Sequence, residues 1–376
     1  MNANLRKLHD TGQRVWLDHI TRELLTSRRL ANYISAFSVT GLTSNPTLFE
    51  HAIASGDAYD DAIHAGASRG LCLEEIFFEL ALQDLKQAAD FFRRIFDASD
   101  GVDGWVLFEV SPLLANDSAN TIRAAARLRT EAARPNLFIK IPGTPVGMVA
   151  IEQSIFDGIP INVTLLFSRD QYVSAAEAYV RGIERRLVAG FDPRVHSVAS
   201  LFVSRWDVAV RDDVSPQFQN RLGIAMAMRS YVAYRKLPAS PRWQMLAVAG
   251  AAPQRLLWAS TGVKDKTVAD TLYVEAPTAH DAINTSPEKT FLEFADHGEV
   301  GEALLVDGGF SEAVLDEFRR EGIDVNALAA RLQRDSVASS SPHGTRCWRG
   351  SPRSVRTALR TPPKPWHEHP NQSSCR

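Results

Sequence analysis

The stretch Asn136-Leu137-Phe138-Ile139-Lys140-Ile141-Pro142-Gly143 places one lysine inside an apolar run that ends in a turn. Such a run is typical of a strand that is buried on both faces of a parallel sheet. Burial disfavours the charged form of an amine, and a lysine that is neutral part of the time can form a Schiff base with a carbonyl. The alternative is that Lys140 lies at a strand end and extends its ammonium to water along its apolar stem.

Similar runs alternate with helical patterns along the chain, which predicts an α/β protein with a parallel sheet. The predicted strands are Gln13 to Leu17, Phe37 to Leu42, Trp105 to Val110, Leu137 to Ile141, Ile161 to Leu166, Ser197 to Val203, Arg255 to Ala259 and Thr271 to Glu275. The predicted helices include Leu73 to Phe96, Ala119 to Ala133, Arg169 to Val188 and Pro216 to Lys236, with Asp117 and Ser118 as candidate N-caps. Eight strands predict a single (β/α)8 TIM barrel with extra helices.

Composition narrows the class of protein further. A chain of 376 residues with 45% hydrophobic content can bury a large core. No stretch approaches the roughly twenty apolar residues that span a bilayer, and the segment Met1 to Lys7 lacks the apolar core of a signal peptide. Cys72, Cys347 and Cys375 are too scattered for a disulfide framework or a zinc site. We therefore expect a cytoplasmic protein with no membrane partner and no bound metal.

Charge is distributed unevenly between the body of the chain and its end. From Ser336 to Arg376 the sequence holds seven Lys or Arg and one Asp or Glu, whereas the whole chain has a formal net charge of -2. This basic segment is rich in Ser, Pro and Arg and has no apolar period, so we expect a barrel domain over residues 1–335 and a disordered tail over residues 336–376. Its basic residues are not interleaved with aromatic ones, which favours a solvated tail over a nucleic-acid-binding one. The fragment His367-Glu368-His369 has no partner ligands that would make a metal site.

Polar residues recur where the predicted strands end. They are Asp18, Thr43-Ser44-Asn45-Pro46, Glu109, Lys140, Asn162 with Thr164, Ser200 with Arg205, and Ser260. Active sites of barrel enzymes form at the C-terminal ends of the strands, so this pattern predicts a site there. Asp18, Asn45 and Ser260 also have local explanations, as helix caps or as the first residue of an Asx turn. Asn162 and Thr164 alternate on one face of an otherwise apolar strand, which we expect to be the barrel interior.

Five separated motifs carry a family resemblance. Thr43-Ser44-Asn45-Pro46-Thr47, Phe108-Glu109-Val110-Ser111, Ile139-Lys140-Ile141-Pro142, Asn162-Val163-Thr164-Leu165-Leu166-Phe167-Ser168 and Trp258-Ala259-Ser260-Thr261-Gly262 together resemble transaldolases, particularly the longer bacterial form. The resemblance runs from about Leu5 to Arg334 and is specific, because the motifs occur in order at strand ends. It implies an enzyme of the pentose phosphate pathway that needs no cofactor and acts on sugar phosphates. No oligomeric state is predicted.

The resemblance also implies the role of each catalytic residue. Lys140 would form the Schiff base with the ketose, and Asp18 would take and return the proton of the C4 hydroxyl. Glu109 would move protons through a water held with Thr164. Two carboxylates beside one lysine then provide separate environments for separate proton transfers.

Other matched positions would bind the substrate. Asn45, Asn162 and Ser200 would hold the hydroxyls of the three-carbon unit, and Arg205 with Ser260 would bind the phosphate. The chain departs from shorter transaldolases at Gly262, where they carry an arginine. We expect Lys264 to substitute for that cation, the alternative being an ordinary exposed lysine.

A second departure concerns the end of the chain. In the family an amphipathic helix continues into a segment that packs near the barrel mouth, whereas here the helical pattern that includes Asp324 to Leu328 stops at about Asp335. We expect the tail to replace the usual ending and to reduce activity.

Two other functions are consistent with a barrel of this kind. The first is a fructose 6-phosphate aldolase, which releases dihydroxyacetone, but those enzymes are shorter and carry an amide where this chain has Glu109. The second is a sugar-phosphate-binding barrel without catalysis, against which the presence of Lys140, Asp18 and Glu109 argues.

Overall fold

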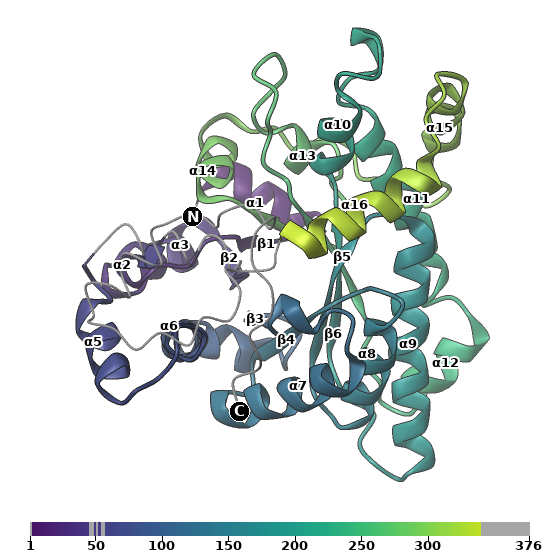
Figure 1. Cartoon of the computed structure of the whole chain (residues 1–376). Helices are drawn as coiled ribbons and strands as arrows, with labels where there is room; N and C mark the ends of the chain where they lie inside the picture. The colour runs from purple at the N-terminus through teal and green to yellow at the C-terminus, as the bar shows by residue number, and fades with distance from the viewer. Residues whose placement is uncertain (1, 45–48, 50–51, 54–56, 340–376) are drawn as a thin grey trace, which may run out of the picture.

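The computed structural model describes residues 2–44, 49, 52–53 and 57–339. Its centre is a closed barrel of parallel strands in the order β1-β2-β3-β4-β5-β6-β7-β8 (Figure 1), which confirms the predicted TIM barrel. The strands are β1 Arg14–Leu17, β2 Val39–Leu42, β3 Val106–Glu109, β4 Leu137–Pro142, β5 Ile161–Leu166, β6 Ser197–Phe202, β7 Arg255–Ala259 and β8 Ile283–Ser286.

Helices surround this barrel and cross its ends. They are α1 Ala3–Asp10, α2 Arg22–Thr26, α3 Arg29–Phe37, α5 Asp60–Ser68, α6 Leu73–Ala98, α7 Ser118–Ala132, α8 Gly147–Phe156, α9 Arg169–Val188, α10 Ser204–Val210, α11 Leu222–Lys236, α12 Pro241–Val248, α13 Leu272–Glu275, α14 Glu288–His297, α15 Ser311–Arg320 and α16 Val325–Ser339, with 3-10 turns η1 Pro112–Leu114 and η2 Pro216–Phe218. None of the helices in the described part of the chain is both long enough and apolar enough to cross a membrane.

The predicted position of the eighth strand is wrong. Thr271 to Glu275 has the aromatic and β-branched residues of a strand, yet Leu272–Glu275 forms the short helix α13. The eighth strand is β8, whose sequence Ile-Asn-Thr-Ser is mostly polar and fully buried. Its Asn284 amide donates to the Tyr273 carbonyl oxygen at 3.1 Å, and Ser286 Oγ donates to Asn284 Oδ1 at 2.8 Å. Internal hydrogen bonds of this kind let a polar segment pair as a buried strand, which local propensity does not reveal.

Two helix boundaries differ from the prediction by more than two residues. The segment from Pro216 to Lys236 is not one helix, because η2 is followed by a turn at Asn220 and α11 begins only at Leu222. Helix α16 continues to Ser339, four residues beyond the predicted break at Asp335. The rest of the predicted tail, residues 340–376, lies outside the described part. Between Asp117 and Ser118 the structure selects Asp117 as the N-cap of α7, where its side chain accepts from the Asn120 N–H.

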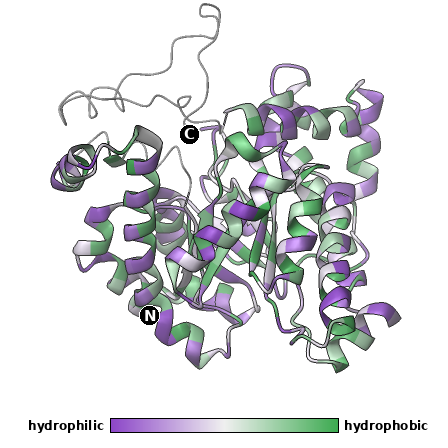
Figure 2. Cartoon of the chain, turned by 60° about the horizontal axis from the view of Figure 1, so that its bottom comes forward, coloured by the Kyte–Doolittle hydropathy of each residue, from purple (hydrophilic) through white to green (hydrophobic). Residues whose placement is uncertain are grey.

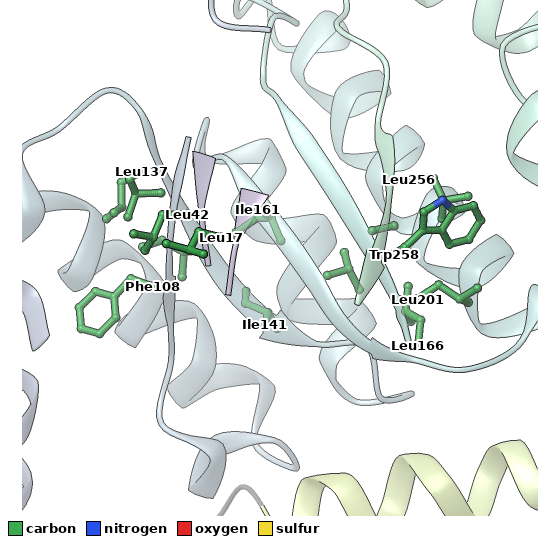
Figure 3. Packing of buried hydrophobic residues seen from close by; sticks show 14 of the residues in the cluster. Leu17, Leu42, Phe108, Leu137, Ile141, Ile161, Leu166, Leu201, Leu256 and Trp258 are labelled. Atoms are coloured by element: carbon green, nitrogen blue, oxygen red, sulfur yellow. The ribbon is translucent and has the colours of Figure 1, made fainter. Parts of the chain in front are cut away.

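Alternating side chains on each strand separate the hydrophobic core into two layers. Outward-pointing residues such as Leu17, Phe108, Ile141 and Trp258 pack between the strands and the helices (Figure 3). Figure 2 shows the matching pattern over the whole chain, with hydrophobic residues concentrated on the central strands and hydrophilic residues on the outer helices. This pattern is expected where helices cover a barrel, because each helix buries one face.

Large apolar side chains fill the barrel interior below the polar residues at the C-terminal ends of the strands. Trp16, Trp105, Leu107, Phe138, Val198, Leu257, Ala259 and Ile283 form one buried cluster. The rings of Trp105 and Phe138 stack with their centroids 3.9 Å apart. Gly41 is required beside them, since a Cβ at that position would lie 2.6 Å from the Trp16 ring. This part of the barrel interior is therefore filled by packed side chains. Toward the C-terminal ends of several strands, the next inward-pointing residues are polar.

Candidate active site

Strand register places Glu109, Lys140 and Asn162 side by side at the C-terminal ends of the strands. Glu109 pairs with Lys140 between β3 and β4, and Lys140 pairs with Asn162 between β4 and β5. Register partners point to the same face, and here they follow the inward-facing Leu107 and Phe138 by two residues. Lys140 Nζ lies 2.9 Å from Glu109 Oε2, with only 13% and 6% of the two side chains exposed. The ammonium therefore stays at the barrel interior and pairs with a carboxylate.

Asp18 directly follows β1 and joins the same interior. Its backbone N–H donates to the Ser286 carbonyl oxygen at 2.8 Å, and its Oδ1 accepts from Thr43 Oγ1 at 2.8 Å. Burial raises the pKa of the Asp18 carboxyl, while the Lys140 charge and the Thr43 hydrogen bond act in the opposite direction. A carboxylate with a raised pKa beside an amine is well suited to accept and return a proton.

Thr43 and Thr285 extend this arrangement, and sequence reasoning assigned neither of them a role. Their hydroxyl oxygens lie 2.9 Å apart, so Asp18, Thr43 and Thr285 form a hydrogen-bonded row across β1, β2 and β8. Thr43 was visible as part of a strand-end motif, and its position after β2 was a sufficient signal. Thr285 was missed because the eighth strand was predicted in the wrong place.

Asn162, Thr164 and Ser200 bring buried polar groups to β5 and β6. Asn162 Nδ2 donates to Ser200 Oγ at 2.7 Å, and the exposed fractions of the three residues are 0%, 0% and 2%. Within the described residues, neither Asn162 Oδ1 nor Thr164 Oγ1 has a hydrogen-bond partner. Buried polar atoms without partners are costly, so they commonly mark a place where a water or ligand binds.

Arg205 and Ser260 lie at the rim, just beyond the ends of β6 and β7. The Ser204 N–H donates to the Ser260 carbonyl oxygen at 3.0 Å, and the two hydroxyl oxygens are 3.1 Å apart. Arg205 is exposed, with its guanidinium 5.6 Å from the Phe202 ring and Nη1 3.3 Å from Ser336 Oγ. A guanidinium at the barrel rim is a suitable anion-binding group.

Asp207 anchors the short helix α10 that carries Arg205. Its carboxylate accepts from the N–H groups of Leu222 and Gly223, at 2.9 and 3.1 Å, and from Tyr273 OH at 2.8 Å. Burial raises the pKa of Asp207 to about 6, although all three donors favour the charged form. These bonds fix α10 to the start of α11 and to α13, so they position the cation at the rim.

Two predicted residues, Lys264 and Asn45, remain. Lys264 is exposed in the segment after β7. Gly262 is buried, and a Cβ there would lie 3.2 Å from Pro287 Cγ, so a side chain at that position would require Pro287 to shift. Asn45 lies outside the described residues.

Comparison with known proteins identifies the family. The family model described as transaldolase/fructose-6-phosphate aldolase matches residues 15–341. Similar curated proteins are a transaldolase of Thermobifida fusca, 41% identical over 90% of this chain and 94% of its own length, and one of Saccharopolyspora erythraea, 40% identical over 89% and 93%. A protein named transaldolase 2 from Nostoc sp. is 39% identical over 89% and 93%. The chain belongs to the transaldolase/fructose-6-phosphate aldolase family.

The match to the transaldolase/fructose-6-phosphate aldolase family spans every strand from Val15 onward and extends through α16. It therefore includes the described strand-end residues that the sequence pointed to, from Asp18 to Ser260. It also includes Ser336, which contacts Arg205 from α16. Sequence reasoning missed Ser336 because it placed this residue in the tail.

Proposed function

We propose that this protein transfers a dihydroxyacetone unit from sedoheptulose 7-phosphate to glyceraldehyde 3-phosphate, giving erythrose 4-phosphate and fructose 6-phosphate. This is the transaldolase reaction of the non-oxidative pentose phosphate pathway. The observation that carries the proposal is the buried Lys140–Glu109 contact of 2.9 Å, within an interior that also holds Asp18. An amine that forms a Schiff base needs proton donors and acceptors close by, and both carboxylates provide them.

The first stage forms the covalent bond between enzyme and substrate. The neutral Lys140 amine attacks C2 of the ketose, and the carbonyl oxygen takes up a proton to give a carbinolamine. Loss of that oxygen as water leaves a protonated imine. Glu109 passes protons in both steps through a water molecule, which Thr164 Oγ1 is free to bind because it has no partner among the described residues.

The second stage breaks and remakes a carbon–carbon bond. Asp18 takes the proton of the C4 hydroxyl, the C3–C4 bond breaks, and its electron pair moves into the iminium to give an enamine on Lys140. The aldehyde product leaves. The enamine C3 then attacks the carbonyl of the acceptor aldehyde, and Asp18 returns its proton to the new hydroxyl. Water adds to the resulting iminium, and the C–N bond breaks to release the new ketose and the Lys140 amine.

The substrate is held at both of its ends. Asn162 lies next to Lys140 in the barrel and donates to Ser200, and both would bind hydroxyls of the three-carbon unit, together with Asn45. Buried amide and hydroxyl groups favour substrates that satisfy them, so they retain the unit until an acceptor arrives. Arg205 and Ser260 would bind the phosphate at the rim, with Lys264 as an added cation on the nearby segment.

Trapping the Schiff base tests the proposal. The protein is treated with fructose 6-phosphate and borohydride, digested, and analysed by mass spectrometry. We expect a reduced three-carbon adduct on Lys140. The absence of an adduct would refute the proposal, and so would an adduct on another lysine.

A second measurement distinguishes transferase from aldolase. The protein is incubated with fructose 6-phosphate, with and without erythrose 4-phosphate as acceptor. We expect sedoheptulose 7-phosphate in the first case and little free dihydroxyacetone in the second. Release of dihydroxyacetone at the same rate in both cases would instead identify a fructose 6-phosphate aldolase.

A further inference from the structure

Gln333 connects the C-terminal helix to the strands that carry the catalytic residues. Gln333 is 8% exposed, and its Nε2 donates to two carbonyl oxygens, those of Gly143 and Leu165, each at 2.9 Å. An amide NH2 group has two hydrogens, so these bonds use its full donor capacity. Figure 3 shows the yellow helix α16 beyond the ends of the strands that carry Ile141 and Leu166.

The two carbonyls that Gln333 binds belong to neighbours of Thr164. Leu165 is its neighbour in the chain, and Gly143 is hydrogen-bonded to it from the end of β4. Leu165 follows Thr164 directly and has a φ of 58°, a conformation unfavourable for a branched side chain. The pairing of β5 with β6 changes register here, between Val163 and Leu166. On the other side, the Gly143 N–H donates to the Thr164 carbonyl oxygen at 2.7 Å. Gln333 therefore binds Gly143, whose N–H donates to Thr164. It also binds Leu165, which follows Thr164 in an unfavourable backbone conformation.

No hydrogen bond from the described residues holds the Thr164 hydroxyl in one direction. Thr164 is 0% exposed, and its Oγ1 has no hydrogen-bond partner among the described residues. A threonine side chain is stiff at χ1, so a shift of its backbone moves the hydroxyl with it. Any group that fixes the backbone at this bulge also fixes the hydroxyl.

We propose that Gln333 is a positioning residue, which aims the Thr164 hydroxyl by binding the carbonyl oxygens of Gly143 and Leu165. The inference rests on the proposed function, since it concerns the water-assisted proton transfers that form the Schiff base. Helix α16 thereby takes part in the chemistry at Lys140 although none of its residues carries out a step. Ser336 lies three residues further along α16 and contacts Arg205, so the same helix also reaches the phosphate end of the site.

The direct test is Gln333→Met, which keeps side-chain length and removes both donors. Borohydride trapping is followed over time with two donors, fructose 6-phosphate and the unphosphorylated dihydroxyacetone. We expect trapping to slow by roughly tenfold with both donors, because a misplacement of 1 Å costs up to about a hundredfold. A rate within twofold of the unsubstituted protein would overturn the proposal.

Gln254→Met provides the matched control. Gln254 is also buried, at 2% exposed, and its Nε2 donates to Ser197 Oγ at 2.9 Å at the opposite end of the barrel. We expect this variant to have a lower Tm with an unchanged trapping rate per folded molecule. If both variants slow trapping equally, the effect of Gln333 is a general loss of stability and the proposal fails.

A double-mutant cycle shows whether the effect passes through Thr164. Gln333→Met is combined with Thr164→Val, which removes the hydroxyl and keeps the shape. We expect Gln333→Met to slow trapping much less in this background than in the unsubstituted protein, because coupled residues are not additive. Equal fold-changes in the two backgrounds would show that Gln333 acts elsewhere.

Gln333→Glu covers the case in which the methionine variant does not fold. A carboxyl can donate to a carbonyl only when protonated. We therefore expect the trapping rate of this variant, relative to the unsubstituted protein, to rise as the pH falls, and a ratio independent of pH would count against the proposal. Failure of the unsubstituted protein to form any adduct is a separate result, because it would refute the proposed function itself.

Discussion

The barrel contains two charged clusters, one at each end, and they differ in what their groups can do. At the C-terminal end Lys140 pairs with Glu109 at 2.9 Å, and Asp18 faces the same interior. At the N-terminal end Arg14 Nε lies 3.1 Å from Asp103 Oδ2, and Asp103 Oδ1 accepts from the Trp16 indole at 3.0 Å. Each cluster places a buried carboxylate against a cation at an end of the barrel.

The identity of the cation separates the two ends. A guanidinium keeps its proton throughout the range in which proteins are stable, so the cluster around Asp103 can hold the chain together but cannot attack a carbon. The amine of Lys140 can lose a proton and form a covalent bond, and two carboxylates are near it to move protons. Burial of charge is therefore not itself a sign of catalysis. The chemistry depends on which groups are buried together.

The largest expected effect is that of Lys140→Arg at the C-terminal cluster. The substitution keeps the positive charge beside Glu109 and removes the nucleophile. We expect kcat for transfer to fall by at least about 10⁴-fold, with no borohydride adduct. Steady-state kinetics and adduct mass measure the outcome. Substantial residual transfer would show that the two clusters do not differ as described.

Asp18→Asn separates stability from activity within the same cluster. We expect kcat to fall by about 10³-fold because the variant cannot accept the C4 hydroxyl proton. The pKa of Asp18 in the fold is raised above the ordinary value of 3.8, so the ionised carboxylate destabilises the fold above the folded pKa, and this cost disappears below pH 3.8. Tm should therefore be higher for Asp18→Asn than for the unsubstituted protein at pH 7. The difference should shrink toward pH 4, and a Tm that is lower at pH 7 would contradict the proposed cost of burial.

Arg14→Met is the corresponding change at the N-terminal cluster. It removes the closest cation from Asp103, which is 4% exposed. We expect the free energy of unfolding to fall by about 2 kcal/mol, less than for a fully buried pair because Arg14 is partly exposed and Arg255 remains 4.0 Å from Asp103. Urea denaturation measures this loss. The transfer rate per folded molecule should stay within twofold, and a large drop would show that the N-terminal cluster also contributes to catalysis.

Lys264→Ala should have the smallest effect. Lys264 is exposed and carries a strongly hydrated ammonium, whereas a guanidinium binds phosphate oxygens in pairs. We expect KM for fructose 6-phosphate to rise by no more than about threefold, with kcat unchanged. Arg205→Ala serves as the comparison and should raise KM much more. An equal rise in the two variants would establish Lys264 as a full substitute for the arginine that shorter transaldolases carry at the position of Gly262.

Most of the barrel was accessible from the sequence because each strand is a short apolar run next to a helical pattern. The first seven predicted strands agree with the structure to within two residues at each end. The eighth did not, because β8 is polar and its side chains satisfy each other only after the barrel closes. The helical pattern of α16 was recognised only to Asp335, whereas the structure continues it to Ser339.

The sequence by itself determined the residue types at the strand ends. A lysine in an apolar strand, carboxylates at Asp18 and Glu109 and the alternation of Asn162 with Thr164 are all visible as local patterns, since side chains alternate across a strand. Those patterns led to the family and to the proposed chemistry without any contact being known.

Only the tertiary structure decided which of these groups meet. The 2.9 Å contact of Lys140 with Glu109, the row formed by Asp18, Thr43 and Thr285, and the contact of Arg205 with Ser336 each join residues that are far apart in the chain. Gln333 shows this most clearly, because its two hydrogen bonds reach residues 190 and 168 positions away. Such contacts depend on barrel register and on where a distant helix packs, and neither leaves a local pattern in the sequence.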